Sequence, residues 1–402
     1  MSELAPVSVP PHVPPSLVRD VDSYHLPGSE DDQFLAMKKL QAESPDIFWT
    51  PRNGGHWILT RGEDLYSLFA NVEFLSNKRI GIPDTPGAIP LLPIEADGAQ
   101  HAAYRKLVQP WFTPKYVDRL ARDVARPLAI RLIGELKPKG GCEFIADFGK
   151  QLPIIVFMEL MGLPHEDAAM LLPWVEISVR STDMAEREAQ FRQMGAYIAE
   201  NVEKKRGRQG DDMMTAVVNA KFDGRPATDP EIHGFCYNLL YGGLDTVAST
   251  LGFVARFLAD SPRHRRQLIE QPELIPKAVD ELLRRFGVAQ PGKICAKDFV
   301  YKGVEFKQGD MVQFQCGMDG LDERRFADPL EVDFTRPTPI MSAFGNGPHR
   351  CPGSYLARSE IKLFLEEWLQ RIPDFQVTPG KKPRCAGGGV AGMTYLPLSW
   401  PV

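Results

Sequence analysis

The sequence predicts a mainly α-helical protein with a small β region. Between about residues 100 and 290, apolar side chains recur at helical spacing, whereas strict alternation is confined to short runs such as 56–61 and 299–317. No Ser/Gly linker, internal repeat or low-complexity tract divides the 402 residues. We therefore expect a single domain over residues 1–402, with a Pro-rich extended arm at about residues 1–20.

The helices follow one another along the middle of the chain. Residues 114–137 and 214–222 have helical spacing, and residues 275–287 have a proline near the start and a glycine at the end. In "ATDPEIHGF", Thr228 and Glu231 form a possible capping box. That pattern predicts the start of a long helix that reaches about residue 259.

The C-terminal part mixes strands with one further helix. The alternating segment 299–317 turns at Lys307–Gly309, which predicts a small antiparallel element. The last residues, "GGGVAGMTYLPLSW", predict a loop and a strand. After Cys351, one apolar helical face is marked by Ile361, Phe364, Leu365, Trp368, Leu369 and Ile372.

Composition excludes several classes of partner. The formal net charge is −5 and the pI is near 6.0, which favours neither nucleic acid nor an anionic membrane. The most apolar run, 152–164, is shorter than the roughly 18 residues of a membrane helix. The N-terminus has no signal-peptide pattern. We expect a cytoplasmic protein.

The six cysteines show no metal or disulfide pattern. The closest two, Cys295 and Cys316, are 21 residues apart, so there is no CxxC motif. In a cytosolic chain they are expected to be reduced thiols, five of them ordinary core residues. Cys351 differs because glycines and prolines frame it and a helix follows at once.

A helix N-terminus stabilises a thiolate. Its unpaired N–H groups and partial positive charge lower the pKa of a nearby cysteine, and His349 and Arg350 add possible cations. Gly345, Gly347 and Gly353 allow backbone shapes closed to other residues. On these grounds alone, Cys351 could be a structural cysteine, a redox-sensing thiol, a nucleophile or an anionic metal ligand.

The full string "FGNGPHRCPG" resembles the haem-binding loop of the cytochrome P-450 superfamily, with the spacing F-x-x-G-x-H-x-C-x-G. The resemblance implies the superfamily's helical triangular prism with a small β region. It implies haem b (iron protoporphyrin IX) with Cys351 as the axial thiolate of the iron. Phe344 would pack near the sulfur, and Gly347 and Gly353 would give room for the turn and for N–H···S bonds.

Glu281 and Arg284, in "DELLRRF", match the superfamily's Glu-x-x-Arg pair. Spaced three residues apart on a helix, they are neighbours and can pair. Most such pairs in proteins are solvated surface charges of little consequence. By the resemblance, they would form a buried structural network with Arg336 of "VDFTRP".

In "LLYGGLDTVAST", two glycines and two polar residues interrupt an apolar helix. Gly242 and Gly243 each cost about 1 kcal/mol relative to Ala. Without the cysteine loop, we would favour a close helix contact at the glycines and a threonine bonded back to a carbonyl. By the resemblance, the glycines open room for O₂, Thr246 holds a water and Asp245 relays protons from solvent.

The segment "HAAYR" places His101 and Arg105 on one face of a helix, because they are four residues apart. Such a pair alone is usually found at the surface. By the resemblance, both face the haem propionates together with His349 and Lys293. These donors and cations match the charge of two carboxylates.

Two segments, "LLYGGLDTVASTLGFVARFLADSPRHRRQLIEQPELIPKAVDELLRRF" and "GLDERRFADPLEVDFTR", resemble the bacterial camphor hydroxylase group. That similarity implies a monomer whose electrons come from a [2Fe–2S] ferredoxin, itself reduced by an NADH-dependent flavin reductase. The ferredoxin would dock on the proximal face near Cys351. Leu65 and Ala102 stand where camphor hydroxylase has arginines on that face, so we do not expect its ferredoxin to be interchangeable with this protein's own.

The expected substrate wall departs from that group. Aligned over residues 77–98, the chain has Ile89 where camphor hydroxylase has the tyrosine that bonds the camphor ketone. That hydrogen bond is worth about 0.5–1.5 kcal/mol net. Tyr241 or Asn238 could bond the substrate instead. The alignment gives the wall as Ile80, Ile89, Leu91, Ile94, Asn238, Tyr241, Gly242, Ala289, Gly389 and Val390.

The resemblance implies an oxidoreductase, a monooxygenase that catalyses RH + O₂ + 2e⁻ + 2H⁺ → ROH + H₂O. Because the wall is apolar and reshaped, we expect a terpenoid or norisoprenoid substrate such as an ionone, with camphor or another monoterpene as the alternative. A peroxygenase would typically lack the Asp245–Thr246 pair. A haem-thiolate gas sensor would require neither that pair nor a large apolar pocket.

Overall fold

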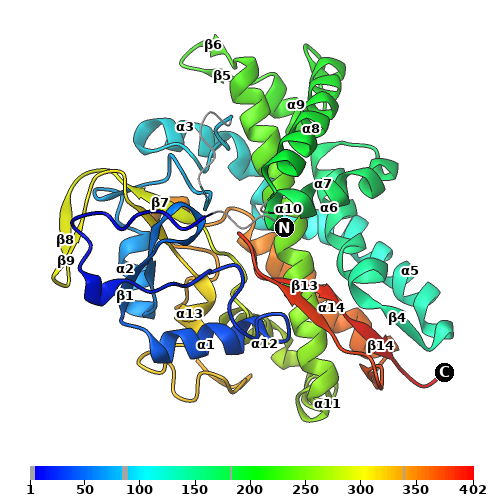
Figure 1. The fold of residues 1–402 in the computed structure, drawn as a ribbon. Coiled ribbons are helices and arrows are strands. Elements are labelled where there is room, and N and C mark those ends of the chain that lie inside the picture. Colours follow the sequence, from blue (N-terminus) through cyan, green and yellow to red (C-terminus); the bar gives the residue numbers. More distant parts are fainter. Residues whose placement is uncertain (1–4, 84–88, 182, 338–339) are drawn as a thin grey trace.

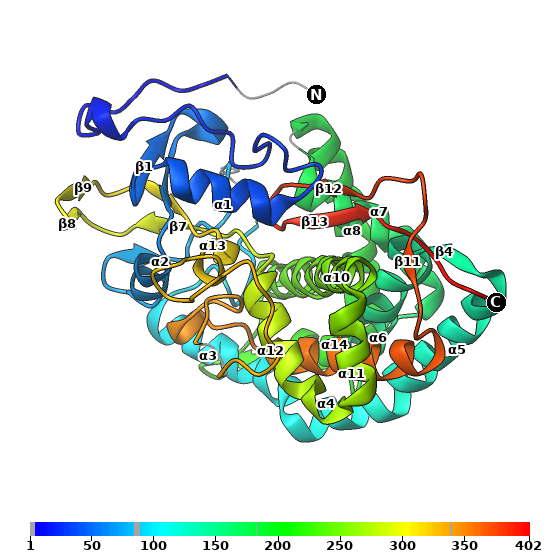
Figure 2. The same cartoon turned by 90° about the horizontal axis from the view of Figure 1, so that it is seen from below.

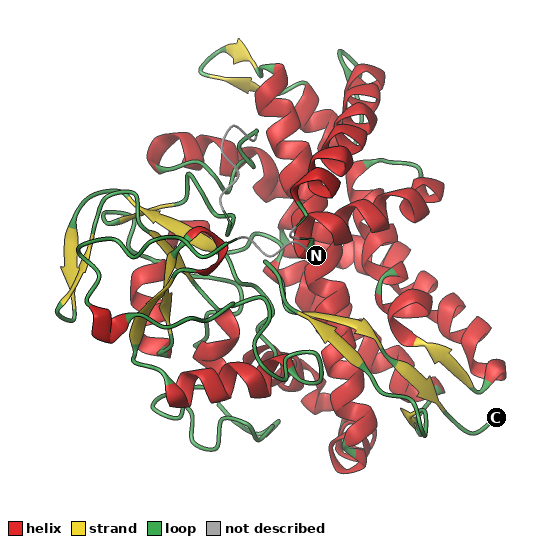
Figure 3. Ribbon diagram, viewed as in Figure 1, coloured by secondary structure: helices red, strands yellow, loops and turns green. Residues whose placement is uncertain are grey.

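The computed structural model describes residues 5–83, 89–181, 183–337 and 340–402. Residues 1–4 of the expected arm and residues 84–88 of the segment aligned over 77–98 lie outside the described residues. The remainder is mainly helical with small sheets, as the sequence predicts. Figure 3 shows the strands at the margins of a helical body.

The helices match the expected order along the chain. They are α1 (Gln33–Glu43), α2 (Gly62–Phe69), α3 (Gly98–Val108), α4 (Pro114–Leu120), α5 (Arg126–Leu136), α6 (Gln151–Met161), α7 (Ala168–Arg180), α8 (Met184–Lys205), α9 (Met213–Val218), α10 (Asp229–Asp260), α11 (Pro262–Glu270), α12 (Ile275–Arg285), α13 (Cys316–Gly320) and α14 (Ser354–Arg371). A π-helical segment, Ala121–Ala125, joins α4 to α5.

The largest sheet has the strand order β1-β2-β10-β7-β3, and a smaller one has the order β11-β14-β4. Strand β10 runs parallel to β2 and antiparallel to β7. The strands are β1 (Ile47–Thr50), β2 (His56–Leu59), β3 (Leu75–Ser76), β4 (Gly141–Glu143), β5 (Lys221–Phe222), β6 (Arg225–Pro226), β7 (Gly292–Cys295), β8 (Phe299–Tyr301), β9 (Val304–Phe306), β10 (Met311–Gln313), β11 (Gln376–Val377), β12 (Arg384–Ala386), β13 (Gly392–Tyr395) and β14 (Pro397–Ser399).

Two expected elements differ from the structure. The helix expected over 214–222 ends at Val218, and residues 221–222 form strand β5 instead. In the segment 299–317, the hairpin turn lies at Lys302 and Gly303, which have φ values of 49° and 81°. The turn expected at 307–309 exists, but it leads from β9 to β10, which pairs with other strands.

Helix α10 runs through the middle of the molecule (Figures 1 and 2). It begins with the predicted capping box, in which the Thr228 hydroxyl accepts from Glu231 N–H and the Glu231 carboxylate accepts from Thr228 N–H. It packs against α6, α7, α8, α14 and β13. The helix therefore carries its polar interruption at residues 242–246 into the centre of the fold.

Helix α14 is fixed beside α10 by its apolar face. All six of the residues predicted for that face are buried. Trp368 packs edge-to-face on Phe144 and Phe148, with ring centroids 5.2 Å apart in both pairs. This packing holds the start of α14, and the loop before it, in one place.

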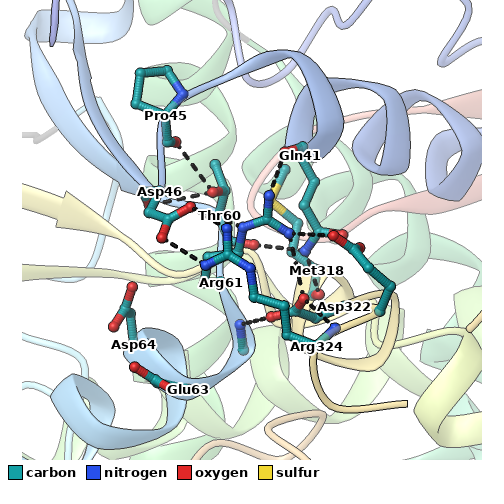
Figure 4. Close-up of polar contacts among 12 residues, drawn as sticks. Gln41, Pro45, Asp46, Thr60, Arg61, Glu63, Asp64, Met318, Asp322 and Arg324 are labelled. Carbon is teal, nitrogen blue, oxygen red and sulfur yellow. Dashed lines mark hydrogen bonds and ion pairs between the residues drawn. The ribbon is translucent and has the colours of Figure 1, made fainter. Parts of the chain in front are cut away.

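A charged network joins the N-terminal elements to the chain after α13 (Figure 4). The Arg61 guanidinium donates to Asp46 at 3.0 Å and to Glu323 at 2.9 Å. Gln41 of α1 donates to the carbonyl of Met318 at 2.9 Å. These contacts anchor the β region to the helical body. Among the described residues, no helix has the length and apolar character that a membrane span requires.

Candidate functional site: a haem-thiolate pocket

A cavity of about 930 Å³ lies between α10, the start of α14 and residues 80–82 and 89–95. Cys351, Thr246 and most of the residues predicted to hold a cofactor border it. Asp245 and Gly347 do not. Every residue predicted for the substrate wall does: Ile80, Ile89, Leu91, Ile94, Asn238, Tyr241, Gly242, Ala289, Gly389 and Val390.

The cysteine loop closes the cavity on the α14 side. Cys351 N–H donates to the Phe344 carbonyl at 2.9 Å, which folds the loop back on itself. Gly345 and Gly347 have φ values of 67° and 69°, in the region that favours glycine. A Cβ on Gly347 would lie 2.9 Å from the Ala70 backbone.

Gly353 does not need the left-handed region that favours glycine. It has φ −77°, and a Cβ there would meet the Cys351 sulfur at an ordinary 3.8 Å. Its N–H acts on the Cys351 sulfur and lowers the pKa of that thiol, in line with the expected N–H···S contact. Phe344 borders the cavity, and the Arg358 guanidinium lies over its ring at 4.7 Å.

The pKa of Cys351 is raised, in contrast to the lowering that its place before a helix predicts. The Cys351 side chain is exposed toward the cavity, and desolvation by the protein atoms around it is the largest cause. The Gly353 N–H and the charges of Arg105 and Arg350 act in the opposite direction. A bound metal cation deprotonates a coordinating thiol outright, so the sulfur is suited to a metal partner.

The four groups predicted for propionate binding lie together beside this loop. The His101 and His349 rings stack with centroids 3.9 Å apart. The Lys293 ammonium donates to the Phe69 carbonyl at 2.6 Å, and Arg105 donates to the Arg350 carbonyl. All four line the cavity.

This cluster has an excess of donors and cations. Burial lowers the pKa values of His101 and Arg105, of Lys293 to about 8 and of His349 to about 3; repulsion from His101 and Lys293 also lowers the pKa of His349. Nε2 of His101 and Nδ1 of His349 are buried without a partner among the described residues. Two carboxylates would satisfy these atoms and offset the repulsion, so the residues present fit the propionates of a haem.

On the cavity wall formed by α10, Gly242 and Gly243 have different surroundings. A Cβ on Gly243 would overlap the Phe157 ring of α6, whereas Gly242 has open space before it. The Thr246 hydroxyl donates to the Gly242 carbonyl at 3.2 Å. The hydroxyl oxygen of Thr246 thus keeps lone pairs that can accept a hydrogen bond from a water in the cavity.

Asp245 does not face the cavity as the proton-relay interpretation requires. Its carboxylate accepts two hydrogen bonds from the Arg180 guanidinium of α7, at 2.8 and 2.9 Å, and its exposed fraction is 5%. Arg180 also donates to Ser249 at 3.2 Å. Nothing in the local sequence indicates this partner, because α7 lies about 65 residues earlier in the chain.

The structure brings Glu281, Arg284 and Arg336 together. Glu281 accepts two hydrogen bonds from Arg284 at 2.8 Å, and the Arg336 Nε donates to Glu281 at 3.3 Å. Arg284 also donates to the carbonyls of Pro329 and Glu331 at 2.8 Å. This buried network ties α12 to the chain that leads into the cysteine loop.

Sequence reasoning missed several polar residues of the cavity. Ser178 of α7 and Gln190 of α8 lie in its wall near Tyr241, and Glu360 of α14 lies near the cysteine loop. Glu360 follows Cys351 by nine residues, so its place in the predicted helix was the available signal. For Ser178 and Gln190 the sequence offers no such signal, because their approach to α10 depends on tertiary packing.

The fold and this site define a haem-thiolate protein. The sequence signature of the family described as Cytochrome P450 matches residues 167–388. The probable cytochrome P450 127A1 of Sinorhizobium fredii is 32% identical over 98% of this chain and 97% of its own length. The crystal structures of cytochrome P450 CYP101C1 and of CYP101J2 are 36% and 33% identical, with TM-scores of 0.89 and 0.88. Each alignment covers 98% of this chain and 100% of that one.

The chain belongs to the cytochrome P450 family. The recognition of the superfamily from the cysteine loop is confirmed, as are the P450 fold, the haem cofactor and the assignment as a monooxygenase. Enzymes of this family need a redox partner and O₂.

Proposed function

We propose that this monooxygenase hydroxylates a small apolar terpenoid or norisoprenoid, ionone-like in size and shape, with O₂ and electrons from a ferredoxin. The observation that carries the proposal is the wall of the cavity. Ile80, Ile89, Leu91 and Ile94 present hydrocarbon on one side, where the camphor hydroxylase group would place a tyrosine donor. A rigid ketone such as camphor would lack its hydrogen bond at residue 89.

Another part of the cavity wall, at Ala289, Gly389 and Val390, leaves room for a longer molecule. Ala289 and Val390 pair as an isolated antiparallel bridge, and Gly389 has open space before it. At about 930 Å³, the cavity lies at the upper end of the usual range of ligand sites, roughly 300–1,000 Å³, and it must hold haem as well as substrate. Substrate volume, rather than one strong polar contact, would then select among apolar molecules.

Relatives in the family do not fix the substrate. The mycinamicin IV hydroxylase/epoxidase of Micromonospora griseorubida is 29% identical over 86% of this chain and 89% of its own length. Its name gives mycinamicin IV as the molecule on which it acts, and one fold can carry many substrate specificities. The proposal therefore rests on the residues of this chain's own cavity.

When bound, haem held by Cys351 supplies O₂ activation and the insertion of one oxygen atom into a C–H bond. The protein must deliver protons to the site and keep bulk water out. Thr246 would hold one water at the cavity wall through its free lone pairs. His101, Arg105, Lys293 and His349 would hold the propionates.

Asp245 would supply protons only after a change of partner. Its carboxylate is held by Arg180 and does not border the cavity. A relay through Asp245 therefore requires that the ion pair open and that the carboxylate rotate toward Thr246, its neighbour on α10. The apolar residues of the wall, such as Ile89 and Val390, would keep bulk water out of the cavity.

The surface around Arg105 and Arg350, next to Cys351, suits an acidic electron donor. A smaller pocket of about 200 Å³ is bordered there by Arg105, Gln109, Phe112, Arg350, Cys351, Pro352 and Ser354. Arg350 is exposed, and so is Ala102 on α3. Leu65 is fully buried, so its expected place on this face is wrong. We propose that a [2Fe–2S] ferredoxin docks here.

Binding tests the substrate class. Titration of the ferric holoprotein with β-ionone should shift its Soret band to shorter wavelength at lower concentration than camphor does. Tighter binding of camphor would overturn the ionone-like assignment and leave the monooxygenase class intact.

The electron donor is tested by charge. Arg350→Gln should slow reduction by a ferredoxin and weaken its dependence on salt, whereas the matched Arg263→Gln, at an exposed arginine of α11, should change neither. Equal effects of the two variants would place the docking surface elsewhere.

Turnover driven by hydrogen peroxide but not by ferredoxin would favour the peroxygenase, and tight gas binding without turnover would favour the sensor.

A further inference from the structure

One part of the cavity wall carries a polar cluster made by three helices. Ser178 of α7, Gln190 of α8 and Tyr241 of α10 all border the cavity. Gln190 is buried, with an exposed fraction of 3%. The side chains of Ser178 and Gln190 lie close enough to the Tyr241 hydroxyl to lower its pKa. The cluster stands out because the neighbouring wall is largely hydrocarbon.

The donors of Ser178 and Gln190 are directed at other protein atoms. The Ser178 hydroxyl has one proton, directed at the Gln190 amide oxygen or at the Trp174 carbonyl 3.0 Å away. The Gln190 amide nitrogen donates to the Met194 sulfur, a weak acceptor, at 3.8 Å. Among the described residues, no group accepts a hydrogen bond from the Tyr241 hydroxyl. Because Tyr241 is half-buried and borders the cavity, its hydroxyl can donate to a ligand that brings an acceptor.

Aromatic stacking holds the Tyr241 ring in place. Tyr241 stacks on Tyr237 at a centroid distance of 5.9 Å, and Tyr237 stacks on Phe191 at 4.4 Å. The Tyr237 hydroxyl donates to the Phe191 carbonyl at 3.0 Å, which locks the middle ring between α8 and α10. The hydroxyl of Tyr241 is therefore presented to the cavity by a preorganised stack.

The charged groups nearby leave Tyr241 a neutral donor. Burial raises the pKa of Tyr241, while Ser178, Gln190 and the more distant Arg187 lower it, and the net direction is upward. Glu188, also in the wall, is paired with Arg192 at 2.7 Å. The cluster therefore offers O–H and N–H groups rather than a charge, which suits a carbonyl or ether oxygen.

Building on the proposed function, we infer that Tyr241, supported by Gln190 and Ser178, is the polar anchor of the substrate and that the substrate carries a carbonyl or ether oxygen at one end. Tyr241 precedes Thr246 by five residues, which is about 7.5 Å along a helix. A molecule anchored at Tyr241 must extend by roughly this distance to bring a C–H bond beside Thr246. This span favours a ketone on an extended side chain over a compact bicyclic ketone.

A matched pair of ligands and a matched pair of variants test the anchor. The ligands are β-ionone and the hydrocarbon of the same skeleton that lacks the ketone oxygen. Each is titrated by the Soret shift into the ferric holoprotein of the wild type, Tyr241→Phe and Tyr237→Phe. Tyr237→Phe removes a hydroxyl from the same stack that is bonded to backbone and does not border the cavity.

We expect the wild type and Tyr237→Phe to bind the ketone roughly three- to tenfold more tightly than the hydrocarbon, and Tyr241→Phe to bind the two equally. A ketone preference that survives in Tyr241→Phe would overturn the anchor. Equal, tight binding of both ligands by the wild type would overturn it too, while leaving the proposed substrate class standing. Failure of the wild type to bind either ligand would overturn the proposed substrate class and the anchor together.

Discussion

The guanidinium of Arg180 and the carboxylate of Asp245 form a buried pair with two parallel hydrogen bonds, 2.8 and 2.9 Å long. The side chains of Arg180 and Asp245 are only 11% and 6% exposed. Burial lowers the pKa of Arg180, but attraction to Asp245 outweighs this effect and the net pKa is raised. The pair joins α7 to α10 and holds Asp245 out of the cavity.

Breaking this pair should destabilise the protein strongly. Arg180→Gln leaves the Asp245 charge buried without a cation, so we expect the free energy of unfolding to fall by about 3–5 kcal/mol. Denaturant unfolding of the holoprotein measures the change. Arg192→Gln is the matched control, because its pair with Glu188 is exposed and is worth about 0–1 kcal/mol. Equal losses in the two variants would contradict the importance of burial.

Thr246 should govern how electrons are used rather than whether they are consumed. Thr246→Ala removes the hydroxyl that would hold a water at the cavity wall, so NADH consumption should continue while hydrogen peroxide rises at the expense of product. Product, peroxide and NADH are measured in the same reactions. Thr250→Ala is the control, since Thr250 also lines the cavity and donates to the carbonyl four residues earlier, at 2.8 Å. Unchanged coupling in Thr246→Ala would place proton delivery elsewhere.

The sequence predicted the parts of the site that depend on local chain geometry. The spacing of Phe344, His349 and Cys351 fixes a loop and the start of a helix, and those relationships hold wherever the loop is placed. The capping box at Thr228 likewise depends on four residues. Such features need no knowledge of tertiary packing.

Contacts between distant helices could not be predicted in the same way. The local sequence indicates an unpaired acid at Asp245 of α10, but the Arg180 guanidinium of α7 pairs with it. Gln190 borders the cavity only because α8 packs on α10. The net pKa of Cys351 differs from expectation for a similar reason. Its desolvation by the surrounding protein outweighs the nearby N–H group and cations.

Replacement of the axial cysteine should change the spectrum of the haem. Cys351→Ser removes the thiolate, so the red-shifted absorbance of the reduced carbon monoxide complex that marks thiolate ligation should be lost. Absorbance spectra of the purified proteins, normalised to haem content, measure this. Cys316→Ala removes another cysteine of the cavity wall and should keep the band. A thiolate-type band that persists in Cys351→Ser would contradict the assignment of the ligand.

Glu360 is a buried carboxyl group with no cation or hydrogen-bond donor nearby that would stabilise its charged form. Its Oε1 has no partner among the described residues, and its exposed fraction is 3%. Burial alone raises its pKa from 4.5 to about 8, with no charged group contributing. The folded protein therefore holds a proton on Glu360 at neutral pH that the unfolded chain releases.

This proton makes stability depend on pH. Between about pH 4.5 and pH 8 the folded state binds more protons than the unfolded state, so the stability from Glu360 is present at low pH and is lost as pH rises. The loss is at most about 5 kcal/mol, because each unit of pKa difference is worth about 1.4 kcal/mol. Glu360→Gln cannot ionise, so unfolding of the variant should match that of wild type near pH 5 and require more denaturant near pH 9. Glu270→Gln, at an exposed position of α11, should follow wild type throughout. A difference between Glu360→Gln and wild type that is the same at both pH values would mean that Glu360 is ionised in the folded protein.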